Sequence, residues 1–275
     1  MAIKSALCIG INDYPGTDMD LQGCVNDAND WSALLTGRGF SVEELLNERA
    51  TKNAMRDAFN RTIAHAGDGD LVVITFSGHG SYELDLDGDE VKGLDQALCP
   101  HDIQTAGESL TDDEIHKLFE ARKDGVRIVL IADSCHSGSV NRDVAPAAPG
   151  LPRKRFLPMR KWMPAARLAR TAELPPQANT PASENFGNSP TQVLGDLLLS
   201  GCDDGETDFS YDAVIAGRPN GAFTFYALKA LKRLPEDATY DAWHQEIVAT
   251  LPTVSYPQRP QLVASAAVRQ RPLLT

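Results

Sequence analysis

A histidine and a cysteine lie in two short motifs of small residues, and each motif directly follows an apolar run. His79 lies in Ser-Gly-His-Gly at residues 77–80, and Cys135 lies in Asp-Ser-Cys-His-Ser-Gly at residues 133–138. A thiol and an imidazole that meet at one site form a nucleophile and its base, because the imidazole takes the thiol proton and later protonates the leaving amine. The two motifs therefore predict thiol catalysis on a peptide bond, with His79 and Cys135 as the catalytic pair.

The residues around this pair suit the same chemistry. The glycines allow a substrate backbone to approach closely, and the amides of Gly80 and Cys135 are candidates to stabilise the oxyanion that forms during attack. The alternative is a structural cysteine and a core histidine, because free cysteines often serve only as small hydrophobic residues. The placement of both residues in turns rich in glycine and serine favours catalysis over this alternative.

Two strands must position the pair. Residues 71–76 and 126–132 are continuous apolar runs rich in β-branched residues, which is typical of strands buried on both faces of a parallel sheet. Cys135 follows His79 by 56 positions, a spacing compatible with neighbouring parallel strands joined by one crossover helix. Active sites of open α/β sheets lie at the carboxyl ends of strands, so we expect the histidine and the cysteine to meet there.

The rest of the chain alternates strands with helices. Apolar patterns predict strands at residues 5–11, 40–46, 194–200 and 261–265, and helices at 24–36, 52–66, 221–233 and 239–251. A further helix begins at Thr111 with the Thr-x-x-Glu spacing of a capping box, and a small hairpin is expected within 81–110. We therefore predict an α/β fold with a mainly parallel central β-sheet flanked by helices on both faces.

Composition limits the classes of function. The 275 residues are 42% hydrophobic, carry a formal net charge of −12 and contain no apolar stretch long enough to span a membrane. The negative charge disfavours nucleic acid as the main partner. Five cysteines without metal-type spacing, in a chain with no export signal, indicate a reduced cytoplasmic protein. We expect a soluble monomer with no nucleic-acid or membrane partner.

A basic, proline-rich loop interrupts the alternating pattern. Residues 141–192 hold nine of the seventeen prolines and show no periodicity, so we expect this loop to be exposed and mobile. The prediction is a single domain over residues 1–275, in which the loop links a larger segment at 1–140 to a smaller one at 193–275.

The two catalytic motifs resemble those of the caspase-like clan, specifically metacaspases and their prokaryotic relatives. Weaker similar blocks occur in the family's order at residues 6–11, 23–28, 93–97, 112–114 and 199–204. The chain lacks the Gln-Ala-Cys-x-Gly signature of animal caspases. The resemblance implies a caspase-like fold of the type I metacaspase kind without a prodomain. It also implies a cysteine endopeptidase that cuts protein or peptide substrates after Arg or Lys.

A pocket for a basic side chain needs carboxylate partners. Asp133 lies two residues before the nucleophile, and Asp27 lies on the first predicted helix in a block that resembles the family's pocket. By the same resemblance, Cys24 and Ser77 line this pocket. The alternatives are a solvated helix residue for Asp27 and an ordinary strand-end turn for Asp133.

The resemblance also implies a calcium site. Its ligands map to Asp95, Asp112 and Asp113, with a fourth carboxylate for which Asp143 is the nearest match. Carboxylates in the first turn of a helix are also favoured by the helix dipole alone, which is the alternative for Asp112 and Asp113. The acidic segment 85–90 does not fit an EF-hand loop and is expected to be a solvated turn.

The basic loop is either a charged surface linker or a substrate of the chain's own active site, because tethering raises its local concentration. The candidate self-cleavage residues are Arg153, Lys154, Arg155, Arg160, Lys161, Arg167 and Arg170. Two other functions stay open at this point. One is a non-catalytic interaction module, since folds host many functions, and the other is transfer to an acyl acceptor other than water.

Overall fold

The computed structural model describes residues 2–86, 93–135, 151–171, 195–203 and 209–275. Its centre is a six-stranded sheet with the order β12-β9-β7-β3-β1-β2. The strands are β1 (Lys4–Gly10), β2 (Ser41–Leu46), β3 (Leu71–Ser77), β7 (Arg127–Asp133), β9 (Leu197–Ser200) and β12 (Gln261–Ala264). All neighbours pair in parallel except β12, which runs antiparallel to β9.

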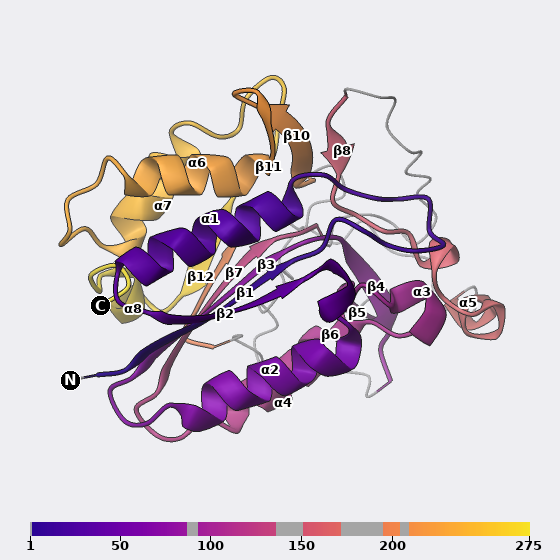
Figure 1. The fold of residues 1–275 in the computed structure, drawn as a ribbon, viewed down its shortest axis with the longest axis horizontal. Helices are drawn as coiled ribbons and strands as arrows, with labels where there is room; N and C mark the ends of the chain where they lie inside the picture. The colour runs from indigo at the N-terminus through magenta and orange to yellow at the C-terminus, as the bar shows by residue number, and fades with distance from the viewer. Residues whose placement is uncertain (1, 87–92, 136–150, 172–194, 204–208) are drawn as a thin grey trace.

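Helices cover both faces of this sheet (Figure 1). One face carries α1 (Cys24–Gly37), α6 (Ala222–Leu231) and α7 (Tyr240–Val248), and the other carries α2 (Lys52–His65) and α4 (Asp112–Glu120). Successive strand residues point to opposite faces, so Leu7 and Ile9 pack on the side of α2 while Ala6 and Cys8 pack on the side of α1. The predicted fold class is confirmed.

Two small antiparallel sheets lie beside the central one. The first consists of β4 (Gly80–Leu84), β5 (Leu94–Leu98) and β6 (Leu110–Thr111), and the second consists of β8 (Arg153–Lys154), β10 (Tyr211–Ile215) and β11 (Arg218–Gly221). The short helices are α3 (Ile103–Ala106), α5 (Ala165–Thr171) and α8 (Ala266–Arg269), with 3-10 turns η1 (Asn47–Arg49) and η2 (Met159–Lys161). None of the helices in the described ranges has the length and apolar character that a bilayer span requires.

Several local predictions are confirmed. The strand before the histidine begins at Leu71, as predicted, and the hairpin expected within 81–110 is β4–β5. The predicted capping box is present: Thr111 Oγ1 accepts from Glu114 N at 3.2 Å, and Glu114 accepts in return from Thr111 N. The β10–β11 hairpin was not predicted, because its strands are short and Gly217 breaks the apolar pattern.

The expectation that the basic loop is exposed is wrong for its described part, residues 151–171. Within that part, several side chains are buried in the core cluster that includes Phe59 and Phe119: Phe156, Leu157, Met159, Trp162 and Met163. Trp162 Nε1 donates to Ser81 Oγ at 2.9 Å, and that hydroxyl donates to the Leu157 carbonyl at 2.7 Å. Packing against the domain, not local periodicity, orders this segment.

Candidate active site

The histidine and the cysteine lie at the same edge of the central sheet. Strands β3 and β7 pair in parallel with Ser77 opposite Asp133, and His79 and Cys135 each follow two residues later. Both side chains are buried, at 1% and 0% exposure. The matched register therefore brings the predicted pair to one place, as the strand-end argument requires.

The surroundings of His79 define its protonation. Its Nε2 lies 2.6 Å from the Met19 carbonyl oxygen, which can only accept, so Nε2 carries the proton. Tyr14 packs on the imidazole with ring centroids 4.7 Å apart, and its hydroxyl accepts from His79 N at 2.8 Å. Burial lowers the pKa of His79 to about 4, against the opposing effect of the Met19 hydrogen bond. The ring is thus neutral at pH 7.

The other ring nitrogen is the one available for proton transfer. In a neutral imidazole protonated at Nε2, Nδ1 is an acceptor. Nδ1 of His79 is buried and has no hydrogen-bond partner among the described residues. The described contacts therefore leave Nδ1 as the acceptor nitrogen of the ring, at the sheet edge where Cys135 also lies.

The two amides considered as oxyanion donors converge on one oxygen. Gly80 N donates to the Arg155 carbonyl at 2.9 Å, and Cys135 N donates to the same oxygen at 3.2 Å. Two backbone donors aimed at one carbonyl are the arrangement that stabilises a developing oxyanion. The carbonyl comes from the basic loop of the same chain.

The Arg155 side chain enters a cluster of three carboxylates and is fully buried. Its Nη2 lies 2.6 Å from Asp27 Oδ2 and 3.1 Å from Asp212 Oδ1, and its Nη1 lies 3.1 Å from Asp133 Oδ2. Burial alone lowers the pKa of the guanidinium, but the surrounding acidic groups raise it well above its ordinary value. A buried cation is tolerated here because charged and hydrogen-bonding partners surround it.

The Asp133 carboxylate also accepts hydrogen bonds from neutral groups. Asp133 Oδ2 accepts from Thr224 N at 2.9 Å and from Thr224 Oγ1 at 2.7 Å, and Ser210 Oγ donates to Asp133 Oδ1. Burial raises the pKa of Asp27 to about 7, although the attraction of Arg155 lowers it. Asp27, Asp133 and Asp212 thus form a buried acidic cluster around the guanidinium of the chain's own Arg155.

Two glycines leave room for this pocket. The Gly221 amide donates to Asp27 Oδ1 at 3.0 Å, and a Cβ at Gly221 would collide with the Asp133 carboxylate and the Arg155 guanidinium. The Gly23 amide, at the start of α1, donates to Asp212 Oδ1 at 2.8 Å. Glycine at position 221 therefore keeps the pocket open.

The four predicted pocket residues lie in or beside this cluster. Asp27 and Asp133 both contact Arg155. Cys24 is fully buried, and burial raises the pKa of its thiol while the charge of Arg155 lowers it, so the thiol is near the guanidinium. Ser77 is 1% exposed and is the register partner of Asp133.

Asp212 is the pocket residue that sequence reasoning missed. It begins an apolar strand segment, Asp-Ala-Val-Ile at residues 212–215, and it is buried at 3% exposure. A buried carboxylate in such a segment destabilises the fold unless a partner compensates its charge. The acidic residue next to an apolar run is therefore the sequence signal for a buried charged site. The partner, Arg155, is 57 positions away and was not predictable from local pattern.

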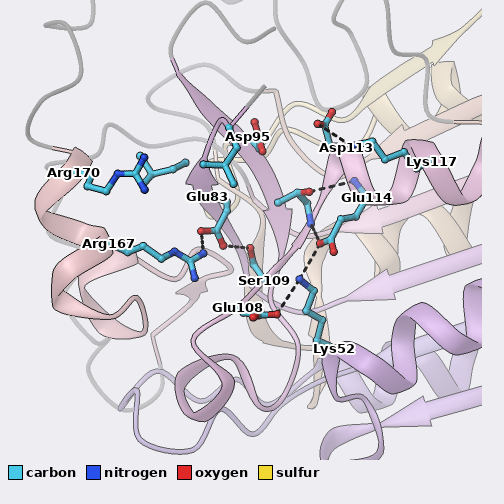
Figure 2. A pocket seen from close by; sticks show the side chains of 13 residues that line it. Lys52, Glu83, Asp95, Glu108, Ser109, Asp113, Glu114, Lys117, Arg167 and Arg170 are labelled. Atoms are coloured by element: carbon cyan, nitrogen blue, oxygen red, sulfur yellow. Dashed lines mark hydrogen bonds and ion pairs between the residues drawn. The ribbon is translucent and has the colours of Figure 1, made fainter. Parts of the chain in front are cut away.

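The predicted calcium ligands are only partly gathered. Asp95 and Asp113 line one pocket of about 590 Å³, together with Glu83 and Arg167 (Figure 2). Asp112 is buried in the first turn of α4, and Asp143 lies outside the described residues. Within the described ranges, no group of three or more His, Cys, Asp or Glu side chains is arranged to hold a metal ion.

The seven candidate self-cleavage residues have different environments. Arg155 occupies the acidic cluster, whereas Arg160 and Arg170 are exposed and Lys161 is half-buried. Arg167 donates to the Gly107 carbonyl at 2.8 Å and pairs with Glu83. Arg153 donates to the Asp20 carbonyl, and Lys154 lies over the Phe209 ring. Of the seven, only Arg155 combines a buried side chain with a carbonyl that accepts from both the Gly80 and the Cys135 amides.

Known proteins are similar to this chain in sequence and in fold. A family model for the metacaspase, peptidase C14 domain matches residues 4–143. Metacaspase-1A of Neurospora crassa is 32% identical over 95% of this chain, which spans 63% of that relative's length. The crystal structure of a Geobacter sulfurreducens protein has a TM-score of 0.71 at 27% identity, with 99% of this chain and 98% of that one covered.

Caspase-1 from Spodoptera frugiperda is a more distant structural neighbour and is similar in fold alone. Its TM-score is 0.56 at 12% identity, over 96% of this chain and 86% of that one. The sheet and the paired motifs thus define a caspase-like cysteine peptidase. The chain belongs to the metacaspase peptidase C14 family, whose members are cysteine-type endopeptidases acting on protein substrates.

Proposed function

We propose that this chain cleaves proteins after Arg or Lys and that it first cleaves its own Arg155–Phe156 bond. The observation that supports this is the position of Arg155. Its side chain fills the acidic pocket, while its carbonyl oxygen accepts from the Gly80 and Cys135 amides. A substrate needs both contacts at once: the side chain in the acidic pocket determines which residue is selected, and the carbonyl at the two amides is positioned for attack.

The reaction follows from these positions. The Cys135 thiol passes its proton to Nδ1 of His79, and the thiolate attacks the Arg155 carbonyl carbon. The amides of Gly80 and Cys135 stabilise the oxyanion. Collapse of this intermediate breaks the C–N bond, and the imidazolium protonates the Phe156 nitrogen as it leaves. Water, deprotonated by His79, then hydrolyses the thioester between Cys135 and Arg155 and restores the thiol.

Self-cleavage is tested with the purified full chain by intact-mass measurement over time, with and without millimolar calcium. Wild-type protein should give fragments that end at Arg155 and begin at Phe156. Cys135→Ala should stay intact, because loss of the nucleophile removes several orders of magnitude in rate. Arg155→Ala should stay uncut at this bond, while the exposed control Arg160→Ala is cut like wild type. Cleavage of Cys135→Ala at the wild-type rate would rule out the assignment.

Specificity is tested in trans with peptides that end in Arg, Lys or Asp before a reporter. The anionic pocket should favour Arg and Lys by at least about a hundredfold over Asp, because Asp would meet three carboxylates without a counter-charge. Asp27→Asn should lower kcat/KM for Arg peptides strongly. A preference for Asp peptides would contradict the pocket.

Calcium stimulation is a further part of the proposal. It is supported by the family resemblance and by the place of Asp95 and Asp113 in one pocket, beside the Glu83 carboxylate that holds Arg167 of the loop. Hard cations of this kind bind carboxylate oxygens. Calorimetry should detect calcium binding to the Cys135→Ala chain and a weaker signal with Asp112→Ala/Asp113→Ala added. Equal binding by both variants would reject these ligands without affecting the catalytic pair.

A further inference from the structure

One aromatic ring lies beside the residues on both sides of the Arg155–Phe156 bond. The Lys154 Nζ lies 3.8 Å from the centroid of the Phe209 ring. Phe156, which follows the Arg155–Phe156 bond, also contacts the Phe209 ring. The two ring centroids are 6.5 Å apart and the interplanar angle is 63°. Phe209 is itself 2% exposed, so neighbouring side chains, including Phe156, cover its ring.

The backbone explains why Lys154 meets this ring while Arg155 meets the carboxylates. Lys154 pairs with Tyr211 in the antiparallel β8–β10 ladder, and Arg155 N continues the ladder by donating to the Ser210 carbonyl at 2.9 Å. Side chains alternate along an extended strand, so neighbouring residues point to opposite sides. Any substrate bound in this register presents the residue before its cleaved Arg to Phe209.

The residue after the cleaved bond enters a second aromatic site. Phe156 is 2% exposed and meets the Tyr82 ring at 6.0 Å and 66°, an edge-to-face arrangement. Phe156 also forms a parallel bridge with Gly80, and Leu157 N donates to the Gly80 carbonyl at 2.9 Å. Main-chain bonds thus hold the strand on both sides of the bond, and aromatic rings take alternate side chains.

We propose that Phe209 and Tyr82 form two specificity subsites, through which the enzyme selects a basic pair followed by an aromatic or large apolar residue. This rests on the proposed cleavage after Arg155 and extends it beyond the acidic pocket. The face of an aromatic ring is electronegative, so it attracts an ammonium or guanidinium group and disfavours a carboxylate. The preferred substrates are therefore protein segments with Lys-Arg or Arg-Arg before the bond and Phe after it.

The first test measures the rate of self-cleavage at Arg155–Phe156 by intact mass. Lys154→Glu should slow it about tenfold or more, while Lys154→Arg should keep it near the wild-type rate. Lys161→Glu is the matched control, because it makes the same charge change in the same segment, away from the cleaved bond. Equal slowing by both Glu variants would mean a general charge effect and would overturn the subsite.

The second test asks whether Lys154 acts through the Phe209 ring. In Phe209→Leu, which keeps an apolar side chain without a ring face, Lys154→Glu should cost much less than it does in wild type. Phe209→Trp should preserve the full Lys154 effect, which guards against misfolding of the Leu variant. A Lys154 effect that is unchanged in Phe209→Leu would overturn the role of this ring.

The third test uses peptides in trans. The Arg–Phe bond of Arg-Lys-Arg-Phe-Leu should be cut about tenfold faster than the Arg–Phe bond of Arg-Glu-Arg-Phe-Leu, and about tenfold faster than the Arg–Gly bond of Arg-Lys-Arg-Gly-Leu. If all three peptides are cut equally, the two subsites are wrong while cleavage after Arg stands. If no peptide and no Arg155–Phe156 bond is cut, the proposed function fails, and this inference fails with it.

Discussion

At the scale of single residues, the hydrogen bond from His79 to the Met19 carbonyl determines which nitrogen can act as the base. The bond fixes the proton on Nε2 and leaves Nδ1 as the acceptor. Because the ring is buried, its pKa of about 4 keeps it neutral across the physiological range. The same burial links the ionisation of His79 to the stability of the folded chain.

This link predicts an acid-dependent loss of stability. An unfolded histidine takes up a proton near pH 6.5, whereas folded His79 does so only near pH 4, so the unfolded state binds more protons between these values. Stability from His79 is therefore present above pH 6.5 and falls by up to about 3 kcal/mol as the pH drops to 4. Asp27 has a raised pKa and therefore has the opposite effect on stability. Its contribution is removed by comparing two proteins that both contain Asp27.

The measurement is the free energy of unfolding of Cys135→Ala against Cys135→Ala/His79→Asn, from pH 7 to pH 4. Asp27 is present in both proteins, so the difference between them isolates His79. As the pH falls from 7 to 4, the free energy of unfolding of the His79 protein should decrease relative to that of the His79→Asn variant. A difference that is constant with pH would show that the ring is not buried as described.

Residue types and motifs predicted much of the site, because several of its residues lie close together in the sequence at the ends of strands. Asp133 ends strand β7, and His79 and Cys135 lie two residues beyond the ends of β3 and β7, so a local sequence pattern marks all three. Asp212 reaches the pocket from a hairpin that packs by long-range contacts, so no local pattern marks it.

At the scale of elements, the segment 156–171 is the part of the loop that anchors Arg155. It is held by Trp162 through Ser81 and by Arg167 through Glu83. Its apolar residues follow neither the helix nor the strand period, and two prolines, Pro158 and Pro164, interrupt them. The absence of periodicity therefore predicted an exposed loop, whereas long-range contacts pack this segment against the core of the domain.

Loss of this anchor should change self-cleavage and peptide cleavage in opposite directions. Trp162→Ala removes a 4% exposed indole and its hydrogen bond, a change worth about 3 kcal/mol or more in a core. Self-cleavage should slow, because Arg155 leaves the pocket more often, while cleavage of added Arg peptides should accelerate. Rates are compared with those of the exposed control Arg160→Ala. A fall in both activities would indicate damage to the domain instead.

At the scale of the whole molecule, the central sheet joins the chain on both sides of Arg155. Strand β9 comes after the loop, yet it pairs with β7 from Val129–Leu197 to Ala132–Ser200. The core contains Trp31 from before the loop and Trp243 from after it, with ring centroids 6.1 Å apart. Cutting one bond between β8 and η2 removes none of these contacts.

The cleaved chain should therefore remain one particle. Size-exclusion chromatography of the wild-type protein after complete self-cleavage should give a single peak at the elution volume of intact Cys135→Ala. Both fragments should be present in that peak on a denaturing gel, and they should separate only in strong denaturant. Separate elution in native buffer would show that the paired strands do not hold the two parts together.

The burial of Arg155 in the acidic cluster of its own chain also predicts the reaction order of the proposed self-cleavage. Enzyme and substrate are covalently one molecule, so dilution cannot separate them and an excess of neighbouring molecules cannot accelerate the event. Each newly folded chain would then mature by first-order decay, with one half-life at every protein concentration. Under the proposed self-cleavage, maturation would be timed from the folding of each chain, and outside proteins would reach the acidic pocket only after the Arg155–Phe156 bond is cut.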